Sequence, residues 1–449
     1  MKTLQLSIAT LLAVPLTLWS DVGDLQKSSL TIYNANLALV HEKRSLSLNE
    51  GMQTLIYPDV AKNINIESIN VTLPKETTLY SQQFRYDKLT LDKLLKAHIE
   101  KKVSLRVLKN AHDFKVISAT LLSYSANDVI VQTSDYKIKS YDKNSVIFSD
   151  IPQTLITKPS LLWNVKSSKN SRSNLELDYL IKNISWKSNY ILNIEKNKAN
   201  LTGWISIENN SGKAFKKTEL KLLAGDVNKA QQPRPILYKA MRSADFNTPK
   251  VSAIAYEGYH VYTIPFPITL LNNEKTQIQY FSKKDIAIQR VYKTHLANPL
   301  YMRGLKKHNV TQYISLPALK SELAKGVVRS YSKLQTQTLF LGETRIGHTP
   351  KNTPLELKIG TNFDIKVEES VLSRSDNNSK LDATIEYSVT NNSDEQKSVE
   401  LLVAFNKDTR SKVKTKEKYN FTKNSELLFN IKVAPNATKR FKVHYTKTK

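Results

Sequence analysis

The chain has 449 residues, and 40% of them are hydrophobic, so it can bury substantial cores and is not a disordered protein. Its length suggests roughly two to four domains. It contains no cysteine, which excludes a disulfide framework, a cysteine nucleophile and a cysteine-linked lipid anchor. Lys and Arg number 67 against 40 Asp and Glu, a formal net charge of +27 that attracts anionic partners.

The first residues have the layout of a secretory signal. One positive charge precedes an apolar stretch from Leu4 to Trp19, which Pro15 and small polar residues interrupt. A membrane anchor needs a longer uninterrupted run. We therefore predict a signal peptide at residues 1–20, cleaved near Ser20, with an uncleaved N-terminal anchor as the alternative. The mature chain, without a transmembrane span, would reside in the periplasm or on the outer surface of a Gram-negative bacterium.

If the chain is exported, its positive charge meets the anions of the cell envelope. Lipopolysaccharide, acidic polysaccharide and phospholipid head groups are the anions of the envelope. No RNA-binding or helix-turn-helix signature accompanies the lysines, so we do not expect nucleic acid. We expect envelope polymers or envelope proteins as partners, and the sequence leaves the oligomeric state open. The competing interpretation is that the lysines reflect coding bias and solubility.

The N-terminal part reads as a β region that ends in one helix, over residues 21–100. Residues 28–85 alternate between apolar and polar side chains, which is typical of several short strands. From Tyr86 the leucines follow helical spacing, which predicts a helix over about 88–100. Residues 101–155 return to alternation, and about five strands in such a short stretch predict a small β-barrel-like insert.

Two later segments share one form, an alternating strand, an Asn-Asn-Ser turn and a second alternating strand. The turns lie at Asn209–Gly212 and Asn391–Asp394. Asn tolerates positive φ and Ser bonds to nearby backbone, which suits both residues to turns. The pattern predicts a mainly β fold with tandem immunoglobulin-like β-sandwiches over residues 156–282 and 283–449.

One stretch inside the first predicted sandwich breaks the alternation. Residues 226–255 are basic and proline-containing, with little periodicity. A long loop of this kind is usually mobile or functional. We predict a mobile basic loop and keep a partner-binding arm as the alternative.

The sequence contains no motif of a catalytic, metal or cofactor site. No two of the eight histidines fall at metal-ligand spacing, and neither Gly-x-Ser-x-Gly nor a phosphate-binding glycine loop occurs. Paired carboxylates can be distant in sequence, and Glu257 and Asp364 are the acids we single out for glycoside hydrolysis. For both, a solvated strand-edge acid is the simpler interpretation.

Two groups of residues are candidates for a ligand or partner surface. One group is a dense polar cluster of Glu343, Arg345 and His348, in which Glu343 and Arg345 share a strand face. We expect these two residues to form an ion pair beside a turn, and the alternative is that the turn contacts a ligand. The other group is aromatic and consists of Trp186, Tyr190 and Trp204. Exposed aromatic rings stack on sugars, although packing in a core is the commoner use.

The sequence resembles the domain-of-unknown-function 4139 family, which includes mucoidy-inhibitor-like proteins. The segments with the resemblance are Tyr179-Leu180, Ser185–Tyr190, Gly203–Gly212, Leu220–Gly225, Gly258–Tyr262, Asn273–Thr276, Gly342–Gly347 and Gly360–Asp364. The segments Ile32–Asn34, Tyr86-Asp87, Leu94-Leu95 and Ile151-Pro152 resemble the companion N-terminal region. The mucoidy-inhibitor name implies a link to extracellular polysaccharide, without naming a catalytic residue. This chain lacks the long coiled coil of better-known members.

Together these features predict a non-enzymatic envelope protein that binds or scaffolds through β-sandwich surfaces and a basic face. A link to surface polysaccharide follows from the family resemblance. Two alternatives remain open, a hydrolase of envelope carbohydrate or peptide and a subunit of a surface or secretion assembly.

Overall fold

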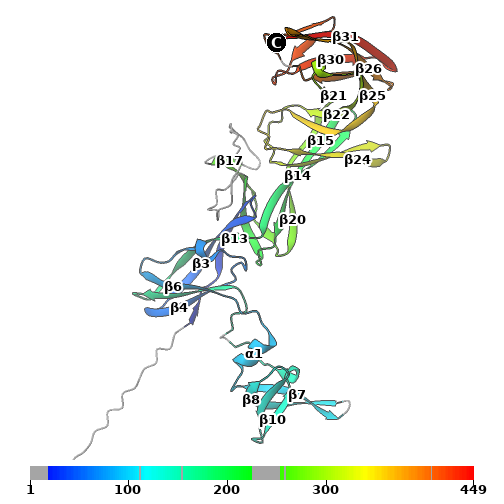
Figure 1. The fold of residues 1–449 in the computed structure, drawn as a ribbon. Coiled ribbons are helices and arrows are strands. Elements are labelled where there is room, and N and C mark those ends of the chain that lie inside the picture. Colours follow the sequence, from blue (N-terminus) through cyan, green and yellow to red (C-terminus); the bar gives the residue numbers. More distant parts are fainter. Residues whose placement is uncertain (1–18, 111–112, 153–154, 225–252, 257–258, 406) are drawn as a thin grey trace, which may run out of the picture. The chain divides into compact units, whose positions relative to one another are not determined.

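The computed structural model describes residues 19–110, 113–152, 155–224, 253–256, 259–405 and 407–449. Strands dominate this part of the chain, with one α-helix (Figure 1), which confirms the mainly β prediction. Most of the predicted signal peptide, most of the basic loop 226–255 and Glu257 lie outside the described residues. No helix in the described ranges is long and apolar enough to cross a membrane.

The chain forms two compact units. The first consists of residues 1–185, 209–221 and 264–274, and the second of residues 186–208, 222–263 and 275–449. One sheet of the first unit has the order β1 (Trp19–Asp21), β4 (Gly51–Pro58), β12 (Ser160–Ser167) and β6 (Thr77–Arg85). Ser20, next to which we predict cleavage, lies in β1 and pairs with Leu55.

A second sheet holds most of the remaining N-terminal strands. From β16 (Phe215–Ala224) onward its order is β16, β2 (Leu25–Tyr33), β3 (Leu37–Leu48), β13 (Ser171–Lys182) and β5 (Asn70–Thr72), with β19 (Ile268–Leu270) paired to β16 and a 3-10 turn η1 at Ile66–Ser68. Burial alternates along β3, so every second side chain enters the core.

The insert contains the five expected strands, and the helix that we expected at the end of the N-terminal β region packs on them. The sheet order is β10 (Ile138–Asp142), β9 (Asp128–Thr133), β8 (Asp113–Tyr124), β7 (Lys102–Asn110) and β11 (Val146–Ile147), with η2 at Lys143–Ser145. Helix α1 (Leu91–Ala97) adds Leu95 to the core of this sheet. The helix is shorter than the predicted 88–100, because Thr90 is extended and its hydroxyl caps the amide of Lys93.

The second unit contains a five-stranded sheet that we call the platform sheet. Its order is β20 (Glu274–Ala287), β15 (Lys198–Asn209), β14 (Ile184–Glu195), β23 (Gly326–Leu334) and β24 (Gln337–Ile346). One face packs on a core that includes Tyr190, Leu201 and Val328. Gly326 permits the close parallel pairing of β23 with β14, because a Cβ there would collide with the carbonyl of Ser188.

The C-terminal strands form one curled sheet. Its order is β28 (Ser411–Thr415), β31 (Ala437–Thr448), β26 (Lys380–Asn391), β25 (Leu355–Asp376), β22 (Leu305–Leu316), β21 (Gln289–Leu296), β27 (Lys397–Val403), β30 (Leu427–Val433) and β29 (Tyr419–Phe421). The rings of Tyr387 in β26 and Phe429 in β30 lie 6.2 Å apart although four strands separate them in the sheet order. The sheet therefore wraps around a single core. The second unit also contains η3 (Pro299–Tyr301) and the hairpin β17 (Ala253–Tyr256) and β18 (Tyr259–Thr263).

The first Asn-Asn-Ser turn is organised by a buried amide. Asn209 donates to the carbonyls of Lys213, Leu270 and Leu271 at 2.9, 3.3 and 3.1 Å. Its amide oxygen accepts from the backbone and hydroxyl of Ser211 at 3.2 and 2.7 Å. One side chain thus fixes the turn to a strand end about sixty residues later.

The second turn repeats this network. Asn391 donates to the carbonyls of Glu395, Val433 and Ala434 at 2.8, 3.3 and 3.1 Å. It accepts from the backbone and hydroxyl of Ser393 at 3.1 and 2.7 Å. The matching bonds confirm that the predicted sequence repeat is a repeat of structure.

Candidate functional site

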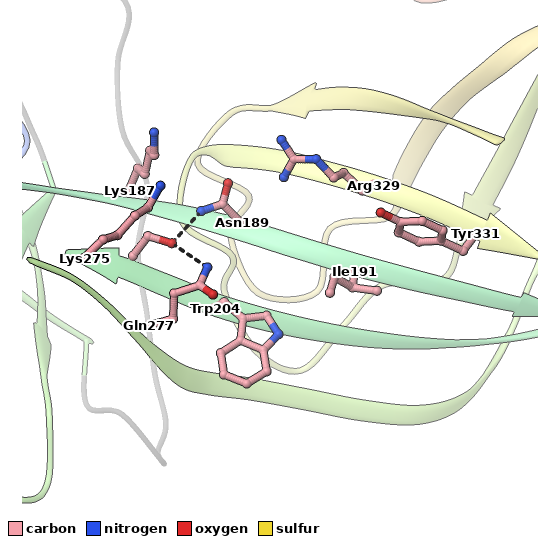
Figure 2. Close-up of a pocket in the computed structure, with 9 residues that line it drawn as sticks. Lys187, Asn189, Ile191, Trp204, Lys275, Gln277, Arg329 and Tyr331 are labelled. Carbon is pink, nitrogen blue, oxygen red and sulfur yellow. Dashed lines mark hydrogen bonds between the residues drawn. The ribbon is translucent and has the colours of Figure 1, made fainter. Parts of the chain in front are cut away.

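A hollow lies on the outward face of the platform sheet. Its volume is 390 Å³, within the range of about 300–1,000 Å³ usual for small-molecule sites. The lining residues are Lys187, Asn189, Ile191, Trp204, Ser206, Lys275, Gln277, Arg329 and Tyr331 (Figure 2). They come from β14, β15, β20 and β23, which are neighbours in this sheet.

Strand alternation decides which side chains reach the hollow. Along β14, Trp186 and Tyr190 are buried, whereas Lys187, Asn189 and Ile191 point to the other face. The register continues this face across the sheet, since Ile191 pairs with Arg329 and Arg329 with Glu343. The next row joins Asn193, Tyr331 and Phe340.

Two aromatic rings contribute apolar surface to the hollow. Trp204 is half-buried and so presents part of its indole to solvent. Tyr331 is also half-buried, and its ring contacts that of Phe340 with 5.5 Å between centroids. Phe340 is 56% exposed, so the apolar surface continues beyond the hollow onto β24.

A small hydrogen-bond network holds the polar lining in place. The amide nitrogens of Asn189 and Gln277 both donate to the hydroxyl of Ser206, each at 3.0 Å, as the dashed lines in Figure 2 mark. Ser206 is buried, so it serves as the fixed anchor for both amides. The amide oxygens of Asn189 and Gln277 remain available to accept hydrogen bonds from a ligand.

The charges of the lining are all positive. Arg329 forms an ion pair with Glu343, with 3.3 Å between Nε and Oε2. Lys187 and Lys275 are exposed, and no carboxylate within the described residues lies at ion-pair distance from either. Within the part of the chain that the structure describes, neither lysine has an ion-pair partner, so both can meet an anion.

The structure separates the aromatic candidates. The indole of Trp186 donates to the carbonyl of Leu223 at 3.3 Å, and the hydroxyl of Tyr190 donates to that of Ala324 at 2.6 Å. Burial raises the pKa of Tyr190. Trp186 and Tyr190 belong to the core, so only Trp204 can contact a ligand from solvent.

The three polar candidates, Glu343, Arg345 and His348, do not lie together at the hollow. Glu343 and Arg345 lie on the hollow's face of the sheet, but the ion-pair partner of Glu343 is Arg329 on the neighbouring strand. The expected Glu343–Arg345 pair is therefore wrong, because cross-strand neighbours lie closer than residues two apart on one strand. His348 accepts from the amide of Lys325 at 3.3 Å and stacks on His260, outside the hollow.

The acids singled out for hydrolysis do not meet in a site that the structure describes. Asp364 is exposed on β25, and Glu257 lies outside the described ranges. Glu369 is buried beside His308, with 2.5 Å between Oε2 and Nε2, and burial raises its pKa although His308 and Lys306 oppose the shift. No group of three or more metal-ligating side chains occurs among the described residues.

Most residues of the hollow were not predicted from the sequence. The alternation in β14 could have shown that Lys187 and Asn189 share a face. Lys275, Gln277 and Arg329 come from strands far along the chain, and nothing local to them indicates which strands pair.

The fold and the hollow define a β-rich protein with an exposed sheet face that is lined by cations and aromatic rings. The chain belongs to the family Domain of unknown function (DUF4139), whose model matches residues 175–448. This match confirms the family resemblance and covers every residue that lines the hollow. No curated protein matches the chain.

Proposed function

We propose that this chain is a non-enzymatic binding protein of the cell envelope that holds an anionic polymer on the platform sheet. One observation carries the proposal. The hollow combines the cations Lys187, Lys275 and Arg329 with the rings of Trp204 and Tyr331 on a single sheet face.

The surroundings of the hollow favour a polymer over a small ion. Apolar surface continues from Tyr331 to Phe340, and Arg345 lies on the same face one row from the Arg329–Glu343 pair. An extended ligand can therefore follow the face beyond the hollow. The formal charge of +27 adds a long-range field that attracts such a polyanion.

The composition of the lining favours binding over turnover. None of its nine residues is a carboxylate or a histidine, the groups that most often serve as general acid or base. Ser206 is engaged by two amides and has no histidine among the lining residues to activate it.

The test is retention of the protein on an immobilised acidic polysaccharide. We expect the full chain to be retained at low salt and Lys187→Gln/Lys275→Gln to elute at clearly lower salt, because two exposed cations of the hollow are lost. Lys412→Gln/Lys414→Gln is the matched control, since it removes the same charge from exposed positions of β28. Equal losses in both variants, or no retention of the unmodified chain, would contradict the proposal.

A further inference from the structure

We propose that the hollow recognises an acidic saccharide, a sugar ring bearing a carboxylate, rather than polyanions in general. This inference rests on the proposed function, because it names the ligand of the same site. Three properties of the lining carry it: an apolar platform, hydrogen-bond acceptors and a limited number of free cations.

The platform is the first property. A pyranose ring has a face of C–H bonds that packs on an aromatic ring, whereas a phosphate or sulfate group has no such face. Trp204 presents its half-buried indole on the hollow side of β15. Its position is held by the alternation of that strand, in which Ile205 and Ile207 are buried.

The acceptors are the second property. Because Asn189 and Gln277 each use the amide nitrogen to donate to Ser206, their amide oxygens can accept hydrogen bonds from a ligand. Sugar hydroxyls can donate to these oxygens. A polyphosphate chain at neutral pH offers acceptors almost exclusively, so the same two oxygens would repel it.

The distribution of charge is the third property. Figure 2 places Lys187 and Lys275 at one end of the hollow and Arg329 with Tyr331 at the other. Glu343 already pairs with Arg329, so this guanidinium is less available to an anion than the two lysines are. One carboxylate at the lysine end, with the sugar ring over Trp204, matches this pattern better than a dense row of negative charges.

Calorimetric titration of the full chain tests the inference with three probes at one ionic strength. The probes are a short oligogalacturonate, its neutral galactose counterpart and inorganic polyphosphate. We expect the oligogalacturonate to bind about tenfold or more tightly than either of the other probes. Each of those probes lacks one kind of contact with the hollow, and the loss of such a contact can account for a difference of this size.

Single-residue variants test how far ring stacking and the amide acceptors, as distinct from charge, contribute to the affinity. Trp204→Ala should weaken the oligogalacturonate about tenfold and leave polyphosphate nearly unchanged, while Trp204→Phe retains most of the affinity because a ring remains. Gln277→Met, which removes an exposed amide, should act like Trp204→Ala but less strongly. The thermal midpoint of each variant shows that it is folded.

The outcomes distinguish the two proposals. If polyphosphate binds as tightly as the oligogalacturonate, or Trp204→Ala weakens both alike, the acidic-saccharide inference is overturned and the binding of anionic polymers stands. If the neutral oligosaccharide binds as tightly, the carboxylate has no role and the inference is again overturned. If no anionic probe binds, both proposals fail.

Discussion

At the scale of single residues, a cluster of buried charges lies in the first unit. Glu42 is fully buried, and its carboxylate meets Lys213 at 2.6 Å, the hydroxyl of Tyr57 at 2.6 Å and Arg44 at 3.4 Å. Lys213 also donates to the carbonyl of Asp59. Burial by itself would raise the pKa of Glu42, but Lys213, Tyr57 and Arg44 together hold it below the usual value.

This network predicts a pH-dependent loss of stability in Lys213→Met. A lowered pKa means that Glu42 stabilises the fold above its ordinary value of 4.5 and that this contribution is lost as the pH falls through the lower, folded value. Without Lys213 the buried carboxylate is poorly compensated, so the variant should lose about 3–5 kcal/mol near pH 7. The loss should shrink as the pH falls through the lowered pKa of Glu42, because the carboxylate that Lys213 compensates is then protonated.

Urea unfolding of both proteins across this pH range measures the effect. Glu42→Gln/Lys213→Met is the control, since it removes both charges and should recover much of the loss at pH 7. A loss that is independent of pH, or a double variant less stable than Lys213→Met, would show that the pair does not act as described.

At the scale of elements, the sequence predicts those turns and helices whose signals come from residues close together in the chain. The Asn-Asn-Ser turns and the helix are correct because their signals lie within a few residues. The carbonyls that Asn209 and Asn391 bind across the fold, at Leu270 and Val433, were not predictable, since they depend on strand pairing. The hollow was missed for the same reason: Trp204 was a candidate, but its neighbours come from three other strands.

The repeat also indicates that the hollow is a feature of one copy. Five residues before the central asparagine, the first copy has Trp204 and the second has Glu386. Three residues before it, both have serine, at Ser206 and Ser388. Glu386 faces Lys442 at 3.8 Å. The second copy thus replaces an aromatic platform with an ion pair, although the turn is the same.

The turn predicts a sharp contrast between two adjacent asparagines. In Asn391→Asp the donor to three backbone carbonyls is lost and a carboxylate takes its place among them, so we expect a loss of about 1–3 kcal/mol or more. Asn392→Asp changes an exposed side chain and should stay within about 0.5 kcal/mol. Thermal unfolding of both variants measures this difference, and equal shifts would contradict the role of Asn391 as the centre of the turn.

At the scale of the whole molecule, the positive charge has a general and a local part. Many surface lysines already have partners, as Lys439 has Glu417 and Lys449 has Asp376. Such exposed pairs contribute little to stability and are weakened by salt. The remaining excess of cations attracts any polyanion over a long range, whereas the hollow holds two exposed lysines beside an aromatic ring. Salt should separate these two effects.

We therefore predict that the affinity for a short oligogalacturonate falls with salt more gently in Lys187→Gln/Lys275→Gln than in the unmodified chain. The reason is that this variant lacks the local charge contacts that salt weakens. Charges farther away than a Debye length, about 8 Å at physiological ionic strength, are largely screened and contribute little to the affinity in either protein. Lys412→Gln/Lys414→Gln should keep the slope of the unmodified chain. Binding measured between low and high salt gives the three slopes. If both variants reduce the slope equally, the general field of the protein, and not the hollow, accounts for the binding of anions.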